Sequence, residues 1–214
     1  EKLGVETSLL GFGCMRLPQT AAGRIDEAET MRMFDLAYNA GVNYFDTAYG
    51  YHDGQSERVT GKMLARYPRS KFFAATKLPM YMVRSLEQAK QIFEEQREKM
   101  GMDYFDFYLL HTLNRDWYDT AVREGIVDYC RQLKREGKIR FLGFSFHDTY
   151  DQFEHIFNDQ DWDFCQIQYN YRDQRFQAGD RGYELAAGRG VPMVVMEPVR
   201  GGQLGQLPAE VTEP

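Results

Sequence analysis

Seven apolar runs, each rich in aromatic or β-branched residues, recur along the chain. Their apolar residues are nearly continuous and do not alternate with polar ones, which is typical of strands buried on both faces of a parallel sheet. The runs cover residues 9–15, 42–45, 72–77, 105–111, 139–146, 164–170 and 192–199. The pattern therefore predicts seven parallel strands.

Helical patterns fill the intervals between these runs. Asp26 and Glu29 have the spacing of a capping box, and they begin a helix that is expected to end at Gly41. Ser85 precedes a second helix that ends at Gly101. A third apolar stripe consists of Val122, Ile126, Tyr129, Cys130 and Leu133, ahead of Gly137. Each strand with its helix takes roughly 30 residues, as a βαβ step does.

Regular alternation of strands and helices allows an open doubly wound sheet or a closed eight-stranded barrel. A dinucleotide fingerprint after the first strand would favour the open sheet, but Arg16 stands where its third glycine is needed. Polar residues at the ends of several strands favour the barrel. A seventh strand that ends near Val199 leaves too little chain for an eighth unit. We therefore predict one α/β domain over residues 1–214, a (β/α)8 TIM barrel that is incomplete at its C-terminus.

The composition is that of a folded globular protein, with 43% hydrophobic residues among 214. Its formal net charge of −6 argues against a nucleic-acid or anionic-membrane partner, because such partners are bound by a basic face. No run approaches the roughly 18 apolar residues of a membrane span. Cys14, Cys130 and Cys165 lie far apart, which fits neither zinc-ligand spacing nor a disulfide framework. We therefore expect no metal site and a cytoplasmic location.

Four residues of catalytic type lie at the ends of successive predicted strands. Asp46 follows the second strand, Lys77 ends the third and His111 ends the fourth, while Tyr51 comes five residues after Asp46. Because the carboxyl ends of all strands in a barrel meet at one face, we expect these four side chains to form one site.

The chemistry of these four groups suits the reduction of a carbonyl. The phenol of Tyr51 has an ordinary pKa of about 10, and an ammonium from Lys77 would lower that pKa by stabilising the phenolate. The carboxylate of Asp46 would keep a buried Lys77 charged. His111 could donate a hydrogen bond to the substrate oxygen that Tyr51 protonates. No side chain supplies a hydride, so the set implies a nicotinamide cofactor.

Five short motifs contain or surround these residues. They are Gly11-Phe12-Gly13, Asp46-Thr47-Ala48 with Tyr51, Ser56-Glu57, Thr76-Lys77, and Asp106 through His111. From about residue 9 to residue 204 the chain resembles the aldo-keto reductases. The resemblance implies a barrel that binds NADPH in an extended conformation without a Rossmann motif. It also puts Asp46, Tyr51, Lys77 and His111 on the catalytic tetrad, with Tyr51 as general acid in reduction and general base in the reverse reaction.

The same resemblance implies which residues contact the cofactor. They are Gly13, Cys14, Met15, Ser145, Gln166, Met196, Pro198, Arg200 and Gly201. Phe146 stands where the family usually has Asn, and Met196 stands where an aromatic ring often covers the nicotinamide, which a thioether does less rigidly. In the family, the segment that binds the 2′-phosphate of the adenosine follows the eighth strand, which this sequence lacks. Kinship alone therefore implies NADPH as the cofactor, and NADH stays open.

Three further strings, at residues 11–18, 143–148 and 196–202, look like a bacterial subgroup whose members often carry a C-terminal iron–sulfur domain. An iron–sulfur cluster needs a closely spaced run of cysteines, which the three cysteines do not provide. We therefore expect such a cluster only if a further domain follows residue 214.

Two other functions remain as alternatives to a reductase of small carbonyl compounds. A lysine at the end of a barrel strand can form a Schiff base, so Lys77 could serve an aldolase-type lyase. A non-catalytic subunit could keep the fold and bind or sense a nicotinamide nucleotide without turnover. Tyr81, Met82, Trp117 and Tyr118 follow strand ends, and they either line an apolar pocket or pack helices on the barrel. The substrate and the oligomeric state stay open.

Overall fold

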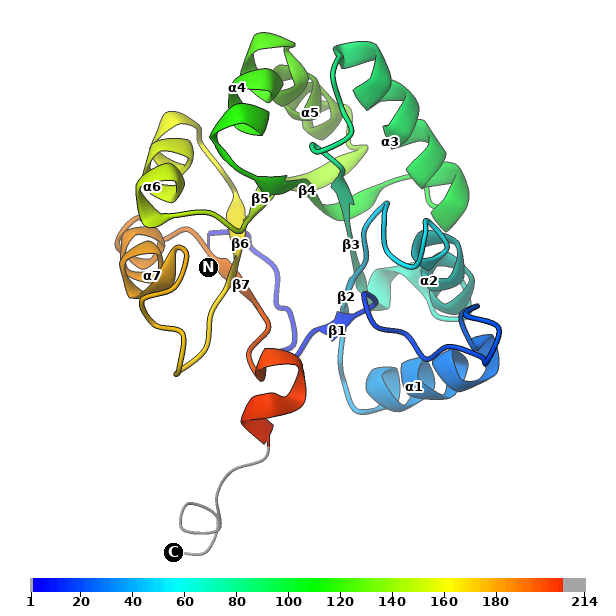
Figure 1. The fold of residues 1–214 in the computed structure, drawn as a ribbon. Coiled ribbons are helices and arrows are strands. Elements are labelled where there is room, and N and C mark those ends of the chain that lie inside the picture. The colour runs from blue at the N-terminus through cyan, green and yellow to red at the C-terminus, as the bar shows by residue number, and fades with distance from the viewer. Residues whose placement is uncertain (1, 206–214) are drawn as a thin grey trace, which may run out of the picture.

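The computed structural model describes residues 2–205. In this part of the chain, seven strands pair in parallel in their order along the sequence. Figure 1 shows that the sheet curls into an arc and carries the helices on its outer side. Strands β1 and β7 form the two edges of the sheet. The predicted incomplete (β/α)8 barrel is thus confirmed.

The seven strands are β1 (Phe12–Gly13), β2 (Tyr44–Asp46), β3 (Phe73–Leu78), β4 (Phe105–Leu113), β5 (Ile139–Phe146), β6 (Phe164–Gln168) and β7 (Met193–Met196). The α-helices are α1 (Glu27–Asn39), α2 (Ser56–Leu64), α3 (Leu86–Met100), α4 (Arg115–Arg123), α5 (Ile126–Arg135), α6 (Tyr150–Asp159) and α7 (Gly179–Gly188). Two short 3₁₀ helices, η1 (Arg69–Lys71) and η2 (Arg200–Gly205), precede β3 and follow β7.

The two edge strands are shorter than the apolar pattern predicts. The predicted strand over residues 9–15 pairs only at Phe12–Gly13, and Leu9 and Leu10 are 96% and 69% exposed. At the other edge β7 stops at Met196, because Glu197 turns the chain with a positive φ of 57°. An edge strand has a partner on one side only, so fewer hydrogen bonds extend it.

The predicted ends of α1 and α3 are close to those observed. The side chain of Asp26 accepts a hydrogen bond from Glu29 N, and that of Ser85 accepts one from Gln88 N. Gly101 ends α3 in the left-handed conformation. The prediction of one helix over the stripe from Val122 to Leu133 is wrong. The stripe is divided between α4 and α5.

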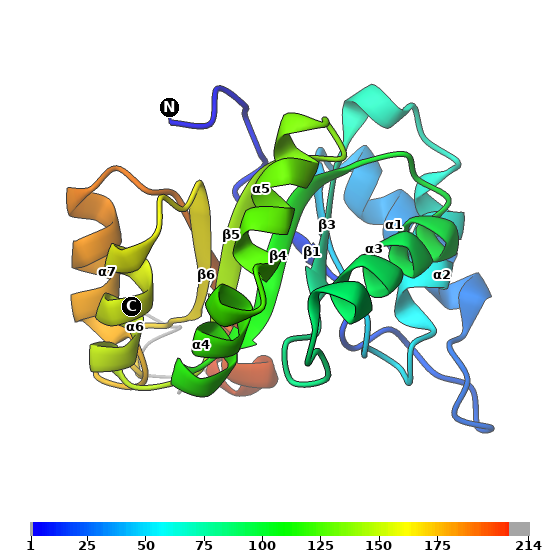
Figure 2. The same cartoon turned by 90° about the horizontal axis from the view of Figure 1, so that it is seen from above.

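A second, smaller core fills the inside of the sheet's curve. It consists of Tyr44, Ala75, Phe107, Leu109 and Phe164, and Leu3 and Val5 pack against it. We call residues 2–8 the N-terminal strap. Lys2 Nζ donates to Trp162 O at 3.1 Å, and Ser8 N donates to Asn43 Oδ1 at 2.7 Å. Figure 2 shows the strap and η2 at opposite ends of the sheet.

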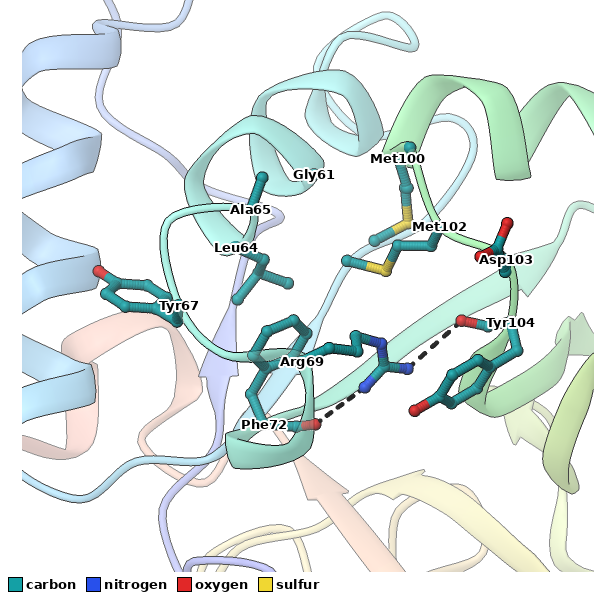
Figure 3. A pocket seen from close by; sticks show the side chains of 11 residues that line it. Gly61, Leu64, Ala65, Tyr67, Arg69, Phe72, Met100, Met102, Asp103 and Tyr104 are labelled. Atoms are coloured by element: carbon teal, nitrogen blue, oxygen red, sulfur yellow. Dashed lines mark hydrogen bonds between the residues drawn. The ribbon is translucent and has the colours of Figure 1, made fainter.

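Figure 3 shows a hollow between the C-terminal ends of α2 and α3 and the segments that precede β3 and β4. The guanidinium of Arg69 lies 4.0 Å from the centre of the Tyr104 ring and donates to the carbonyls of Phe72 and Tyr104. It also pairs with the buried Asp106 at 2.6 Å. The volume of about 240 Å³ is below the roughly 300 Å³ of small-molecule sites. The hollow lies at the amino end of the sheet, away from the strand ends described next.

Candidate active site

The carboxyl ends of β2, β3 and β4 bring the four predicted catalytic residues together. Asp46 ends β2, Lys77 lies one residue before the end of β3, and His111 lies near the end of β4. Tyr51 lies in the turn that follows β2. The three strands are neighbours in the sheet, so their ends lie side by side. The predicted convergence is therefore observed.

The ammonium of Lys77 is buried and fixed by two oxygens. It donates to Asp46 Oδ1 at 2.5 Å and to the carbonyl of Thr47 at 2.7 Å. Only 1% of the Lys77 side chain is exposed. Burial by itself lowers the pKa of Lys77, but Asp46 and Tyr51 together outweigh burial and the pKa rises above its usual value. Lys77 therefore stays charged.

The phenol of Tyr51 packs against this ammonium, with Lys77 Nζ 5.1 Å from the ring centre. Burial raises the pKa of Tyr51, and although Lys77 lowers it, the net direction is upward. The expectation that Lys77 would lower this pKa below its ordinary value is therefore wrong, because desolvation of the phenolate outweighs the attraction of the ammonium. Tyr51 carries its proton at neutral pH.

His111 lies beside Tyr51, with 5.8 Å between the ring centres and 77° between the ring planes. Burial, together with smaller contributions from the charges of Lys77 and His147, lowers the pKa of His111 to about 3. The imidazole is therefore neutral at physiological pH. The next residue, Thr112, has a positive φ of 56° and interrupts the register between β4 and β5. This irregularity lies in β4 directly after the histidine.

Aromatic side chains form one wall of the site. Tyr81 lies 5.8 Å from His111 and 6.1 Å from Trp117 between ring centres. Its hydroxyl lies over Gly50, where an added Cβ would be only 2.4 Å away, so a larger residue at position 50 would displace this hydroxyl. Met82 is 48% exposed nearby in the same loop. Three of the four candidate pocket residues therefore lie after β3 or β4 on the site's side.

Tyr118, the fourth candidate for the pocket, lies elsewhere. It is buried on α4, its hydroxyl donates to Asp159 at the end of α6, and its ring meets His155 edge-on at 6.0 Å. Tyr118 thus packs one helix against another, which is the alternative use considered for these residues.

Ser145 and Gln166 are register partners on β5 and β6. Ser145 Oγ accepts a hydrogen bond from Thr112 N at 2.7 Å, and its own proton is free to be donated. Gln166 Nε2 donates to Asp46 Oδ2 at 3.2 Å. Gln166 Oε1 is buried and has no hydrogen-bond partner among residues 2–205. One free donor and one free acceptor therefore lie next to each other beside Asp46.

The remaining predicted cofactor residues lie at or after the carboxyl ends of the two edge strands. Gly13, Cys14 and Met15 end or follow β1, Met196 ends β7, and Pro198, Arg200 and Gly201 follow β7. Cys14 N donates to Asp46 O at 2.8 Å, and Cys14 O accepts from Ser56 Oγ at 3.0 Å, so its backbone is part of the framework. Gly201 has a φ of 66°, and a Cβ there would lie 2.8 Å from Arg16 Nη1.

The loop after β7 is tied to the loop after β6. Arg200 Nε lies 3.5 Å from Asp173 Oδ2, which also accepts from Asn170 Nδ2 at 2.9 Å and from Gln168 Nε2 at 3.1 Å. Gln168 Oε1, like Gln166 Oε1, is buried without a partner in the described part of the chain. The polar groups of β6 are therefore only partly satisfied by the protein itself.

The buried Gln96 behind β3 was not found by the sequence reasoning. Gln96 of α3 bonds Glu57, Thr76 and Tyr108, as well as the carbonyl of Lys77. The available signal is its place on the apolar face of α3, four residues after Ile92 and four before Met100. A polar residue on such a face is buried with its partners when it is satisfied.

Residues 2–205 contain neither a cysteine that is ionised at neutral pH nor a candidate metal site. Cys14, Cys130 and Cys165 are free and buried, and burial raises the pKa of each thiol to about 12. In the same residues, His, Cys, Asp and Glu form no group of three that could hold a metal ion. None of the described helices combines the length and apolarity needed to cross a membrane.

Comparisons with known proteins show which proteins this chain is similar to. The model of the Aldo/keto reductase family matches residues 9–209. L-galactose dehydrogenase of Arabidopsis thaliana is 32% identical over 145 residues, which cover 65% of this chain and 45% of that protein. The NADH-specific methylglyoxal reductase of Escherichia coli (strain K12) is 26% identical over 185 residues, which cover 78% of this chain and 56% of that protein.

A solved structure shares the architecture. The holo form of an aldo-keto reductase from Bacillus halodurans has a TM-score of 0.77 and 28% identity, and the match covers 95% of this chain and 66% of that one. The chain thus spans about half the length of the two curated relatives named above.

Proposed function

Because this chain belongs to the aldo/keto reductase family, we propose that it reduces a small aldehyde or ketone to an alcohol. Tyr51 is the general acid, and a reduced nicotinamide dinucleotide is the hydride donor. The observation that carries the proposal is the buried contact of Lys77 with Asp46 and Tyr51. That contact stabilises a phenolate only after Tyr51 has given up its proton.

The residues at β5 and β6 fit the carboxamide of a nicotinamide ring. A primary carboxamide has an N–H group to donate and an oxygen to accept. Gln166 Oε1 is a buried acceptor without a partner among the described residues, and the hydroxyl of Ser145 is a free donor beside it. The rest of the dinucleotide would lie along the carboxyl ends of the two edge strands, beside Gly13, Met15, Met196, Pro198, Arg200 and Gly201.

The protein's own groups provide the proton and the electrostatic stabilisation. When bound, the dinucleotide supplies a hydride to the carbonyl carbon. Tyr51 donates its proton to the carbonyl oxygen, and neutral His111 donates a hydrogen bond to the same oxygen. The phenolate left on Tyr51 is stabilised by Lys77, which Asp46 keeps charged. Two oxygens hold the ammonium of Lys77 before the reaction begins, so its charge requires little reorganisation.

The wall formed by Tyr81 and Trp117 supports an apolar substrate. The ring of Tyr81 lies next to His111, and the ring of Trp117 lies next to Tyr81. We propose that the substrate is a small-molecule carbonyl with an aromatic or aliphatic substituent.

We also propose that the protein is located in the cytoplasm, because three free cysteines suit a reducing compartment.

The aldolase alternative is disfavoured by the state of Lys77. A Schiff base requires a neutral amine, whereas Asp46 raises the pKa of Lys77 and two oxygens occupy its ammonium. Treatment with borohydride and an aldehyde should therefore leave Lys77 unlabelled. Labelling of Lys77 in a peptide map would support the lyase instead.

The test follows the loss of NADPH or NADH absorbance by the full-length protein with a panel of aldehydes and ketones. We expect turnover, and we expect Tyr51→Phe to lower kcat by roughly 10²-fold or more while dinucleotide affinity stays unchanged. Tyr49→Phe is the matched control, because its hydroxyl bonds Glu95 of α3 and not the site. Tyr49→Phe should keep its turnover.

Two results would contradict the proposal. Equal loss of turnover in Tyr51→Phe and Tyr49→Phe would remove Tyr51 as the proton donor. Binding of the dinucleotide without reduction of any carbonyl would favour a nucleotide-sensing subunit over a reductase.

A further inference from the structure

A chain of buried polar groups connects α2, β3, α3 and β4 behind the active site. Glu57 Oε1 accepts hydrogen bonds from Thr76 Oγ1 and Gln96 Nε2, both at 2.6 Å. Gln96 Oε1 accepts a bond from the hydroxyl of Tyr108 at 2.7 Å. All four residues are fully buried. A carboxylate costs free energy to bury, so a network that keeps one here calls for a specific role.

This network reaches the backbone of Lys77. Gln96 Nε2 donates to the carbonyl of Lys77 at 3.0 Å and lies 3.2 Å from Thr76 Oγ1. Side chains alternate along a strand, so Thr76 faces the helices while the side chain of Lys77 faces the inside of the sheet. Figure 1 shows α2 and α3 on the outer side of the sheet next to β3. The network therefore holds Lys77 from the side opposite its ammonium.

Ser56, the residue before Glu57, holds the segment that binds the ammonium of Lys77. Ser56 Oγ lies 2.9 Å from Thr47 Oγ1 and donates to Cys14 O at 3.0 Å. The carbonyl of Thr47 is one of the two oxygens that accept bonds from Lys77 Nζ. The first turn of α2 thus anchors both the backbone of Lys77 and an acceptor of its ammonium.

We propose that Glu57 is a positioning residue for Lys77, which it holds through Thr76 and Gln96. This inference rests on the proposed reductase function, since the position of Lys77 matters for the proton that Tyr51 gives up. A displacement of about 1 Å in a catalytic group can lower a rate by roughly 10²-fold. Loss of the network therefore affects the chemical step more than substrate binding.

The test uses single substitutions in the full-length protein. Thr76→Val removes the hydroxyl that bonds Glu57 and keeps the shape, whereas Thr76→Ser keeps the hydroxyl. Thr30→Val is the matched control, because Thr30 is fully buried in α1 and its hydroxyl has no partner among residues 2–205. The measured quantities are kcat, KM, the pH dependence of kcat/KM, and the pKa of the Lys77 ammonium from its ¹⁵N resonance.

We expect Thr76→Val to lower kcat by about tenfold with KM changed by less than about twofold. The pKa of Lys77 should fall by about half a pH unit or more, because burial lowers that pKa once Asp46 is less well placed. The alkaline limb of kcat/KM should move upward, because a less well placed ammonium stabilises the phenolate of Tyr51 less. Thr76→Ser should restore kcat to within about threefold. Thr30→Val should match the wild type.

A Thr76→Val protein that matches Thr30→Val in kcat and in the pKa of Lys77 would overturn the inference while the reductase function stands. If the wild type reduces no carbonyl, the proposed function fails. The pKa of Lys77, measured from its ¹⁵N resonance, then tests the positioning role of Glu57 by itself. A lowered pKa of Lys77 in Thr76→Val then supports positioning, and an unchanged pKa refutes it. If Thr76→Val does not fold, Gln96→Met is read in the same way.

Discussion

Tyr51 and His111 lie 5.8 Å apart between ring centres, and burial moves their pKa values in opposite directions. Burial disfavours the phenolate of Tyr51 and the imidazolium of His111 alike, so the first pKa rises and the second falls. Both groups are consequently neutral across physiological pH, and each carries an N–H or O–H proton. Lys77 is the charged member of the three.

Lys77→Met tests the part of that charge in the reaction. The substitution removes the ammonium that stabilises the phenolate, so we expect kcat to fall by roughly 10²-fold or more and the pKa of Tyr51 to rise further. Steady-state kinetics over a range of pH measures both effects. Lys62→Met is the control, because Lys62 pairs with Glu27 on the exposed side of α2. Similar kinetics for the two variants would contradict the assignment.

His111 makes the folded protein sensitive to acid. Its pKa is about 3 in the folded protein and 6.5 in an unfolded chain, so the unfolded chain binds more protons between these values. The stability contribution is present above pH 6.5 and is lost as the pH falls toward 3, with a slope of at most about 1.4 kcal/mol per pH unit. Urea unfolding at several pH values should show a shallower pH dependence for His111→Gln than for the wild type. Parallel curves would refute the shifted pKa.

At the scale of elements, α4 depends on its first turn. The side chain of Asn114 accepts a hydrogen bond from Trp117 N at 2.9 Å and caps the helix. Asn114→Ala should lower the free energy of unfolding by about 1 kcal/mol, whereas Asn114→Asp retains a cap. Because the same turn carries Trp117 of the aromatic wall, KM should rise in Asn114→Ala and not in Asn114→Asp. Chemical denaturation and steady-state kinetics check the two effects. An unchanged KM in Asn114→Ala would show that the Asn114 cap does not position Trp117 for substrate binding.

The strands could be predicted from sequence because a buried parallel strand needs a continuous apolar run, as in β5. The break between α4 and α5 could not be predicted from sequence, because Val122 and Ile126 are four residues apart and keep the helical period across the break. Gly125, with a φ of 71°, permits the left-handed residue at which the second helix begins. Val122 itself is 45% exposed.

Convergence of the site residues was predictable for a similar reason. Asp46, Lys77 and His111 end neighbouring parallel strands, and parallel strands share one carboxyl edge. The polar network behind them depends on pairings that no local pattern indicates. Gln96 and Glu57 are 39 positions apart, and their contact exists only because α2 and α3 pack side by side.

At the scale of the whole molecule, the N-terminal strap closes the inner core. Val5 packs against the cluster that contains Phe107 and Phe164. Val5→Ser should lower the free energy of unfolding by about 1–2 kcal/mol, because part of a valine side chain loses its apolar surroundings. Thr7→Ser is the matched control at an exposed position of the strap. Urea denaturation compares the two, and equal stabilities would show that the strap adds nothing to the core.

The strap also constrains the order of folding. Lys2 and Trp162 are 160 positions apart, so the strap is synthesised long before its partner. Contacts of such separation have a large loop-closure cost and tend to form late. During synthesis the inside of the curved sheet therefore stays open to water until β6 is in place. Docking of the strap then excludes water from the inner core. The fluorescence of Trp162 should therefore change in the slowest phase of refolding.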